Sequence, residues 1–133
     1  MDAECKVAIK SEHDIVVARQ KGRAMARDFG FSISDATLIA TAISELARNI
    51  IAYAREGMIT MNFIYTSKRE GLLIVASDEG PGIADIPLAL RDGFSTSGSL
   101  GIGLPGVRRL MDEFDITSQP GVGTIVTVTK WKP

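Results

Sequence analysis

The stretch GFSTSGSLGIGLPGVRRL, residues 93–110, decides the fold of this chain of 133 residues. It is rich in glycine and serine and leads into a segment with the apolar periodicity of a helix. Gly101, Gly103 and Gly106 form the pattern G-x-G-x-x-G, which marks a dinucleotide site only when a strand precedes it and a helix follows. The surrounding elements therefore determine which phosphate, if any, this loop can hold.

Those surroundings argue against a dinucleotide-binding unit. In such a unit the glycines directly follow a buried strand and open a crossover to a parallel strand. Here Ser, Thr and Gly residues precede them, and the helix after them leads into a hairpin. The chain also lacks the Gly-Lys-Ser or Gly-Lys-Thr of a P-loop. We therefore expect a different phosphate-binding arrangement.

The first thirty residues predict a strand and an amphipathic helix. Residues 4–10 alternate weakly, as in a strand. Ser11 and Asp14 have the spacing of a capping box, and the apolar stripe that follows ends at Gly30. The polar side of this helix carries three arginines: Arg19, Arg23 and Arg27. They indicate either a solvated helix face or a docking face for an acidic partner, and exposed charges commonly contribute little energy.

A second, longer helix follows. Ser32 or Ser34 can cap its start, and Gly57 closes it just after residue 56. Its apolar stripe has helical spacing and consists of Ile39, Ile43, Ala47, Ile50 and Ala54. This helix is predicted to be the spine of the fold.

The remaining elements are two hairpins and a helix. Residues 58–66 and 70–77 form the first pair of strands, and residues 114–118 and 123–131 form the second. The helix between the pairs has an apolar side made of Val107, Leu110, Met111 and Phe114. This order predicts an α+β two-layer sandwich, in which helices cover one face of a mixed, mostly antiparallel sheet. At this length we expect a single domain over residues 1–133.

Composition narrows the class of protein. A formal net charge of -1 and a hydrophobic content of 45% exclude disorder and general nucleic-acid binding through a basic surface. A lone Cys5 gives neither an internal disulfide nor a metal cluster. The apolar runs are far shorter than the roughly twenty residues of a membrane span, and the N-terminus has no signal-peptide pattern. We expect a cytoplasmic protein that binds neither nucleic acid nor membrane.

The loop SDEGPG, residues 77–82, begins where the apolar run LLIVA ends. Asp78 therefore stands at a strand terminus, where its carboxylate can accept a hydrogen bond from an exocyclic amine such as that of adenine. Gly80 and Gly82 let the backbone approach the ring of such a ligand. Taken alone, the loop is more typical of a simple turn.

The motif SELARN, residues 44–49, lies in the second helix. Glu45 and Asn49 are four residues apart and share a face, opposite the apolar stripe. An amide oxygen suits Mg²⁺, and a carboxylate one turn away can accept a proton. A solvated helix face is the alternative interpretation of this pair.

Glu45 with Asn49, then DEGPG, the glycines of residues 101–106 and a closing GVGT occur in this order in one family. The sequence resembles the GHKL ATP-binding family, whose Bergerat fold serves histidine kinases, DNA gyrase, the Hsp90 chaperone and anti-sigma serine kinases. The resemblance covers about residues 41–124.

The resemblance implies ATP and Mg²⁺ as cofactors, Asn49 as the metal ligand and Glu45 as the catalytic residue. The nucleotide contacts that it implies are Asn49, Asp78, Gly80, Gly82, Ser97, Gly98, Gly101, Ile102, Gly103, Leu104 and Thr124. Independently, glycine-flanked amides at a helix N-terminus suit a triphosphate, and Pro105 fits the first turn of that helix.

Within the family, the length and the motifs are similar to the small kinases that phosphorylate Ser or Thr on STAS-domain partners. Anti-sigma relatives often carry His four residues after the motif Asn, where this sequence has Tyr53. This departure favours the switch-kinase branch, which implies a STAS-domain scaffold as substrate and a downstream effector such as a PP2C-type phosphatase. The alternatives are an anti-sigma factor and a nucleotide-dependent binding module with little kinase turnover.

Overall fold

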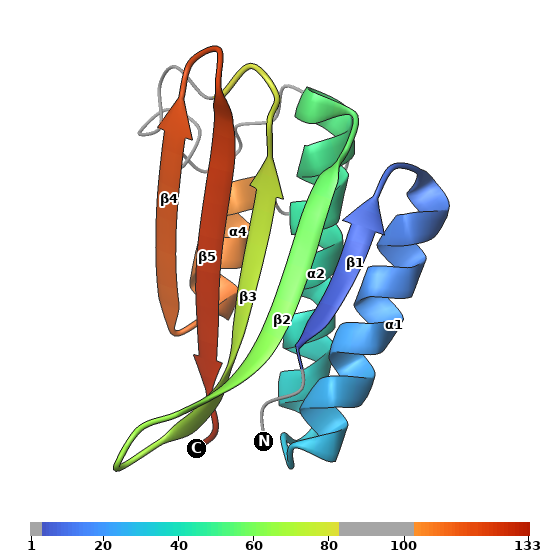
Figure 1. Ribbon diagram of the computed structural model, residues 1–133. Coiled ribbons are helices and arrows are strands. Elements are labelled where there is room, and N and C mark those ends of the chain that lie inside the picture. The colour runs from blue at the N-terminus through green and yellow to red at the C-terminus, as the bar shows by residue number, and fades with distance from the viewer. Residues whose placement is uncertain (1–3, 83–102) are drawn as a thin grey trace.

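The computed structural model of the chain describes residues 4–82 and 103–133 (Figure 1). These residues form three helices and five strands. In chain order they are β1 (Cys5–Ile9), α1 (Glu12–Asp28), α2 (Ile33–Ala54), β2 (Gly57–Tyr65), β3 (Glu70–Asp78), α4 (Gly103–Leu110), β4 (Glu113–Gln119) and β5 (Gly123–Trp131).

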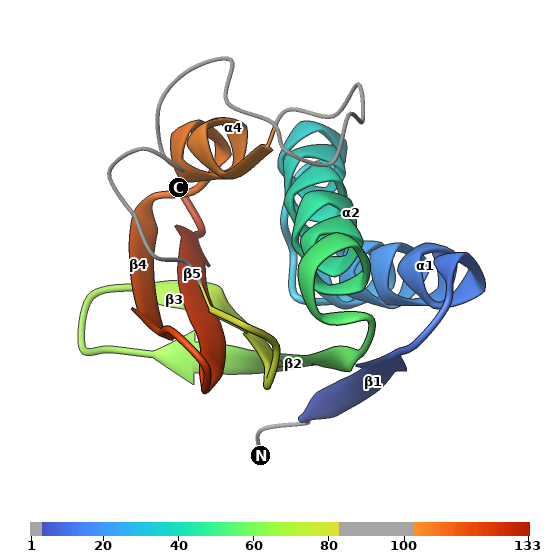
Figure 2. The same ribbon diagram turned by 90° about the horizontal axis from the view of Figure 1, so that it is seen from above.

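The strands make one sheet in the order β1-β2-β3-β5-β4. Both predicted hairpins are present, and the pairing of β3 with β5 joins them. All four neighbouring pairs are antiparallel. Seen from above, the three helices lie on one face of the sheet (Figure 2). The predicted α+β two-layer sandwich with a mostly antiparallel sheet is confirmed.

The start of α1 follows the predicted capping box. The Asp14 carboxylate accepts hydrogen bonds from the backbone amides of Lys10 at 2.8 Å and Ser11 at 3.1 Å. The bond from Lys10 is the largest cause of a lowered pKa of Asp14. At the other end the chain leaves the helix through Gly30, whose φ of +99° lies in the region that favours glycine.

Ser32, rather than Ser34, caps α2, because its hydroxyl accepts a hydrogen bond from the amide of Asp35 at 3.0 Å. The helix ends at Ala54, two residues before the predicted end, and Arg55 then turns the chain at a φ of +71°.

α4 is shorter than its apolar pattern predicts. Phe114, expected on the helix, lies in β4 and packs against the core from the sheet.

α2 lies at the centre of the molecule, in contact with α1, α4 and the sheet. Residues 42–47 are consecutively buried, so that the helix is enclosed on all sides at its middle. Glu45 falls within this run and is only 5% exposed. The interpretation of Glu45 and Asn49 as a solvated face is therefore wrong for Glu45, whose carboxylate lies against the N-terminus of α4.

Close packing of α1 on α2 depends on Gly22. A Cβ at this position would overlap Cδ1 of the fully buried Ile43. Gly22→Ala is therefore expected to lower the free energy of unfolding by about 1–3 kcal/mol, the usual range for overpacking a core. Urea denaturation measures this change. Adding Ile43→Val removes the overlapping methyl group and is expected to recover part of the lost stability. A double variant whose loss equals the sum of the two single losses would contradict this packing.

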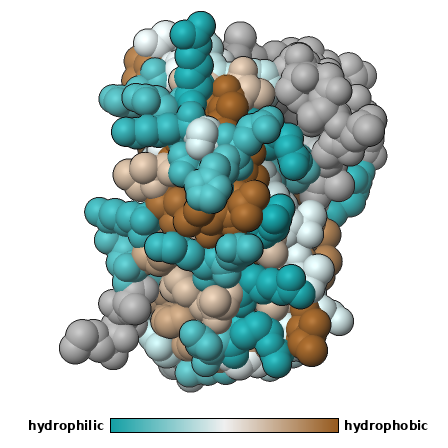
Figure 3. Space-filling view, turned by 90° about the vertical axis from the view of Figure 1, so that its right-hand side faces the viewer, coloured by the Kyte–Doolittle hydropathy of each residue, from teal (hydrophilic) through white to brown (hydrophobic). Residues whose placement is uncertain are grey.

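The face of the molecule that carries α1 is largely hydrophilic, and a hydrophobic area lies near its middle (Figure 3). Of its three arginines, Arg27 has a structural partner, because its guanidinium donates a hydrogen bond to the carbonyl of Phe31 at 2.8 Å. Arg23 is exposed and Arg19 is half-buried. A docking role for this side stays a hypothesis.

No helix in the described ranges is both long and apolar enough to cross a membrane.

Candidate functional site

A small cleft, partly open to solvent, lies between α2 and the ends of β3 and β5. Its walls are mostly apolar and come from α2, β3, β5 and α4: Leu46, Ile50, Ala76, Leu104 and Val126. Few polar groups converge on it, which is the usual composition of a site for a small ligand. The sheet and α2 thus form two walls that could hold a flat ring between them.

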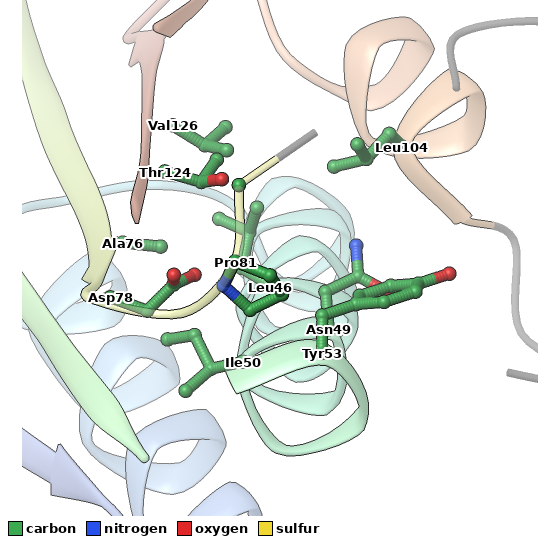
Figure 4. A pocket seen from close by; sticks show the side chains of 11 residues that line it. Leu46, Asn49, Ile50, Tyr53, Ala76, Asp78, Pro81, Leu104, Thr124 and Val126 are labelled. Carbon is green, nitrogen blue, oxygen red and sulfur yellow. The ribbon is translucent and has the colours of Figure 1, made fainter. Parts of the chain in front are cut away.

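Among the described residues that line the cleft, Asp78 is the charged one. It is the last residue of β3 and pairs in register with Thr124 on β5. Its Oδ1 accepts a hydrogen bond from the amide of Gly80 at 2.9 Å, which fixes the carboxylate. In the described part of the chain, no group donates a hydrogen bond to the second oxygen, Oδ2. Figure 4 shows this carboxylate turned toward the interior of the cleft.

The glycines of this loop are also required by packing. A Cβ on Gly80 would lie 2.6 Å from Cβ of Ala54, so the loop touches the end of α2. Gly82 has a φ of +79°, and a Cβ there would overlap the backbone carbonyl oxygen of Gln119. The bare backbone predicted for ligand contact therefore also closes the loop onto its neighbours.

This packing gives a matched pair of variants. Gly82 and Gly121 have nearly equal φ values, +79° and +80°, but a Cβ on Gly121 would meet nothing within 4 Å. Gly82→Ala is expected to lose more stability than Gly121→Ala, because only Gly82→Ala pushes against backbone. We expect a difference of about 1–3 kcal/mol in the free energy of unfolding, the scale of overpacking, measured with urea. Equal losses of stability in the two variants would show that glycine is needed at position 82 only for its backbone conformation.

Thr124 lies beside Asp78 and is 8% exposed. Its hydroxyl shares a hydrogen bond of 2.9 Å with the hydroxyl of Ser118 across the β4–β5 hairpin. The turn of this hairpin is joined to the loop after β3, because the amide of Gly121 donates to the carbonyl of Pro81 at 2.8 Å. The hairpin thereby fixes one wall of the cleft.

The opposite side of the cleft is formed by α2. Asn49 and Tyr53, one turn apart, lie across from Asp78 and Thr124 (Figure 4). Tyr53 is 40% exposed and stands at the cleft wall. From the sequence, Tyr53 was noted only as a departure from relatives. Its four-residue spacing from Asn49 is the signal that could have placed it in the site.

Glu45 lies one turn before Asn49 on α2, outside the lining of the cleft. Its Oε1 accepts a hydrogen bond from Arg48 Nη1 at 2.5 Å. Its Oε2 accepts one from the amide of Gly103, the first residue of α4, at 3.3 Å. The carboxylate therefore joins α2 to the N-terminus of α4. Arg48 was not predicted as part of the site, although opposite charges three residues apart on a helix are a known pairing signal.

The structure thus brings together a large part of the predicted site. Leu104 lines the cleft with Asn49, Asp78, Gly82 and Thr124, while Gly80 lies in the loop beneath it. Gly103 contacts Glu45, and Pro105 is in the first turn of α4, as predicted. Four predicted nucleotide contacts lie outside the described residues: Ser97, Gly98, Gly101 and Ile102.

The donor set fits the magnesium nucleotide that the sequence implies. No cluster of three or more His, Cys, Asp or Glu side chains suited to a metal occurs in residues 4–82 and 103–133. Mg²⁺ does not require one, because it keeps several waters and takes further oxygens from phosphates. A single amide oxygen from Asn49, at the edge of an apolar cleft, is compatible with this form of binding.

Comparison with known proteins identifies the family. The model of the histidine kinase-like ATPase domain matches residues 10–130. The chain belongs to this ATPase family. The resemblance to GHKL proteins is thereby confirmed. A mycobacterial sensor histidine kinase, MprB, has the same fold, with a TM-score of 0.56 at 16% identity over 98% of this chain and 99% of the other.

Two relatives of this ATPase domain are of similar length. The serine/threonine-protein kinase RsbT of Bacillus subtilis is 53% identical over 98% of this chain and 97% of its own length. An anti-sigma F factor of Caldanaerobacter subterraneus is 35% identical over 96% of this chain and 92% of its own length. The similarity to both relatives therefore extends over nearly the whole chain.

Proposed function

We propose that this chain is an ATP-dependent protein serine/threonine kinase that acts in partner-switching signalling. The supporting observation is the position of two carboxylates. Asp78 faces an apolar cleft suited to a base, and Glu45 lies on the other side of Asn49, held at the N-terminus of α4. The identity with RsbT, a kinase by name, over nearly the full length of both chains supports the same activity.

Nucleotide binding is assigned to the cleft. Asp78 accepts a hydrogen bond from the exocyclic amine of adenine, and Thr124 contacts the same edge of the base. Apolar side chains of α2 and the sheet cover the ring. Asn49 would hold Mg²⁺, and the ion would supply positive charge that offsets the charge of the phosphates. Gly103 and Leu104, together with Ser97, Gly98, Gly101 and Ile102, contact the phosphates.

Glu45 is the general base in this proposal. It takes the proton from a Ser or Thr hydroxyl of the substrate protein as that oxygen forms its bond to the γ-phosphorus. The bond between the γ-phosphorus and the bridging oxygen breaks, and ADP leaves with its electrons. Because Glu45 is almost fully buried, its carboxylate is held in place and shielded from competing water.

The protein partners belong to the same proposal. We assign a STAS-domain protein as the substrate and a PP2C-type phosphatase, or a similar effector, as the protein activated after release. We also propose that residues 1–133 form one domain and that it works in the cytoplasm. These assignments follow from placing the chain among the small switch kinases. The motif SELARN, the residue Tyr53 and the identity with RsbT support that placement.

A second candidate is sequestration of a transcription factor. It is favoured by the 35% identity with an anti-sigma F factor over most of both chains. In that case the chain would co-purify with a sigma factor in the presence of ATP, rather than with a STAS-domain protein.

The proposal is tested by incubating the protein with magnesium and ATP labelled in the γ-phosphate, together with a STAS-domain protein from the same organism. We expect label on a Ser or Thr of the STAS-domain protein, located by mass spectrometry. ATP binding without any transfer would instead identify a nucleotide-dependent binding module. Capture of a sigma factor without transfer would favour the anti-sigma function.

A further inference from the structure

Both oxygens of the Glu45 carboxylate have partners from different elements. Oε1 accepts from Arg48 on the next turn of α2, and Oε2 accepts from the Gly103 amide of α4. An ionised carboxylate offers about four acceptor positions, so about two remain to take a proton. The contacts therefore fix the direction of the group without exhausting its capacity as a base.

The two members of the ion pair differ in their surroundings. The Glu45 side chain is 7% exposed, while that of Arg48 is 38% exposed. Side chains on a helix lean toward its N-terminus, so that Arg48 reaches back over the turn that carries Glu45. The guanidinium thus remains in contact with water, and the carboxylate that it holds does not. An arginine in this position can orient a buried carboxylate without being buried itself.

Orientation matters for a base of this kind. A glutamate side chain has three rotatable bonds, and a carboxylate displaced by about 1 Å can lower a rate by about a hundredfold. The apolar neighbours of Glu45 on α2, Leu46 and Ala47, supply no hydrogen bond to its head group. Among the described residues, Arg48 and the Gly103 amide are the two donors to the carboxylate.

We propose that Arg48 is a positioning residue for Glu45: it holds the carboxylate in the rotamer that places Oε2 on the Gly103 amide. This inference rests on the proposed function, because it assigns a purpose to the orientation of the base. It goes further by extending the catalytic machinery to a residue outside the cleft. A purely structural i,i+3 pair would leave the Gly103 contact unchanged when Arg48 is removed.

The contact can be measured without substrate, by NMR on the ¹⁵N-labelled protein. Glu45→Gln gives the reference for an altered hydrogen bond at the Gly103 amide. Arg48→Ala is expected to shift the Gly103 amide signal and to speed its hydrogen exchange, and Arg48→Lys to restore most of the wild-type behaviour. Lys68→Ala, which removes an exposed positive charge in the β2–β3 turn, is the control. An unchanged Gly103 amide in Arg48→Ala would overturn the proposal.

A kinetic cycle tests the catalytic consequence in the transfer assay with the STAS-domain protein. Arg48→Ala is expected to lower kcat by about tenfold to a hundredfold while KM for ATP stays unchanged, and to have no further effect in the Glu45→Gln background. Equal losses in both backgrounds would overturn the proposal by showing that Arg48 acts independently of Glu45. If Glu45→Gln alone keeps wild-type turnover, the base assignment and this inference both fail, whereas ATP binding and the kinase assignment stand. Arg48→Gln, which keeps a neutral hydrogen-bond donor, replaces Arg48→Ala in these measurements if Arg48→Ala does not fold.

Discussion

Replacing Glu45 by glutamine is expected to lower the rate of phosphoryl transfer by about a hundredfold to ten-thousandfold, the usual contribution of a general base. The amide has nearly the same shape as the carboxylate but cannot accept the proton of the attacking hydroxyl. ATP affinity is expected to stay close to that of the wild type, because Glu45 does not line the cleft. Single-turnover transfer of labelled phosphate gives the rate, and calorimetry gives the affinity.

The matched control for this variant is Glu56→Gln, which removes an exposed carboxylate just after the end of the same helix. Its transfer rate should equal that of the wild type. Wild-type turnover in Glu45→Gln would remove Glu45 from the mechanism. A parallel loss of ATP affinity would show instead that Glu45 acts by holding α4 against α2, through the contact of its Oε2 with Gly103.

Replacing Asp78 by asparagine is expected to weaken ATP binding by about tenfold to a hundredfold. A hydrogen bond to a charged group contributes about 1.5–3 kcal/mol, and each 1.4 kcal/mol is about tenfold in affinity. The asparagine keeps an oxygen that can accept from the Gly80 amide, so the loop after β3 retains its shape. Its NH₂ group then faces the amine of the base, where a donor meets a donor.

Calorimetric titration with ATP measures this loss. Glu79→Gln is the control, since it removes one negative charge from the next residue, which is exposed. Its affinity for ATP should match that of the wild type, which separates a specific contact from a general charge effect. Wild-type affinity in Asp78→Asn would show that the base does not bind at this carboxylate.

The fold could be predicted to a large extent from local patterns. The alternation of apolar residues predicted both hairpins, and the structure contains them. The strand β5 has the predicted bounds, 123–131. Local signals do not report which hairpins pair, so the joining of β3 to β5 appears only in the structure. Apolar periodicity also misassigned Phe114. Phe114 instead lies in β4, and its side chain packs against the core from the sheet layer.

The site was predicted where chemistry is local and missed where it depends on packing. The position of Asp78 at the end of β3 could be predicted, because a carboxylate at the end of an apolar strand is visible in the sequence. The burial of Glu45 was missed, because it depends on α4, which covers α2 from 58 residues away along the chain. For the same reason Gly80 was assigned to ligand contact, whereas its position against Ala54 is also a packing requirement.

The most direct test of the account is thermal unfolding of the wild-type protein with magnesium alone and with magnesium plus ADP, ATP or GTP. A ligand at about a hundred times its Kd adds about 2.7 kcal/mol, enough to raise Tm by several degrees in a domain of this size. We expect ADP and ATP to raise Tm in a manner that depends on magnesium, and GTP to have little effect, because guanine presents an oxygen where adenine presents its amine. No increase with any nucleotide at millimolar concentration would contradict both the cleft assignment and the kinase function that depends on it.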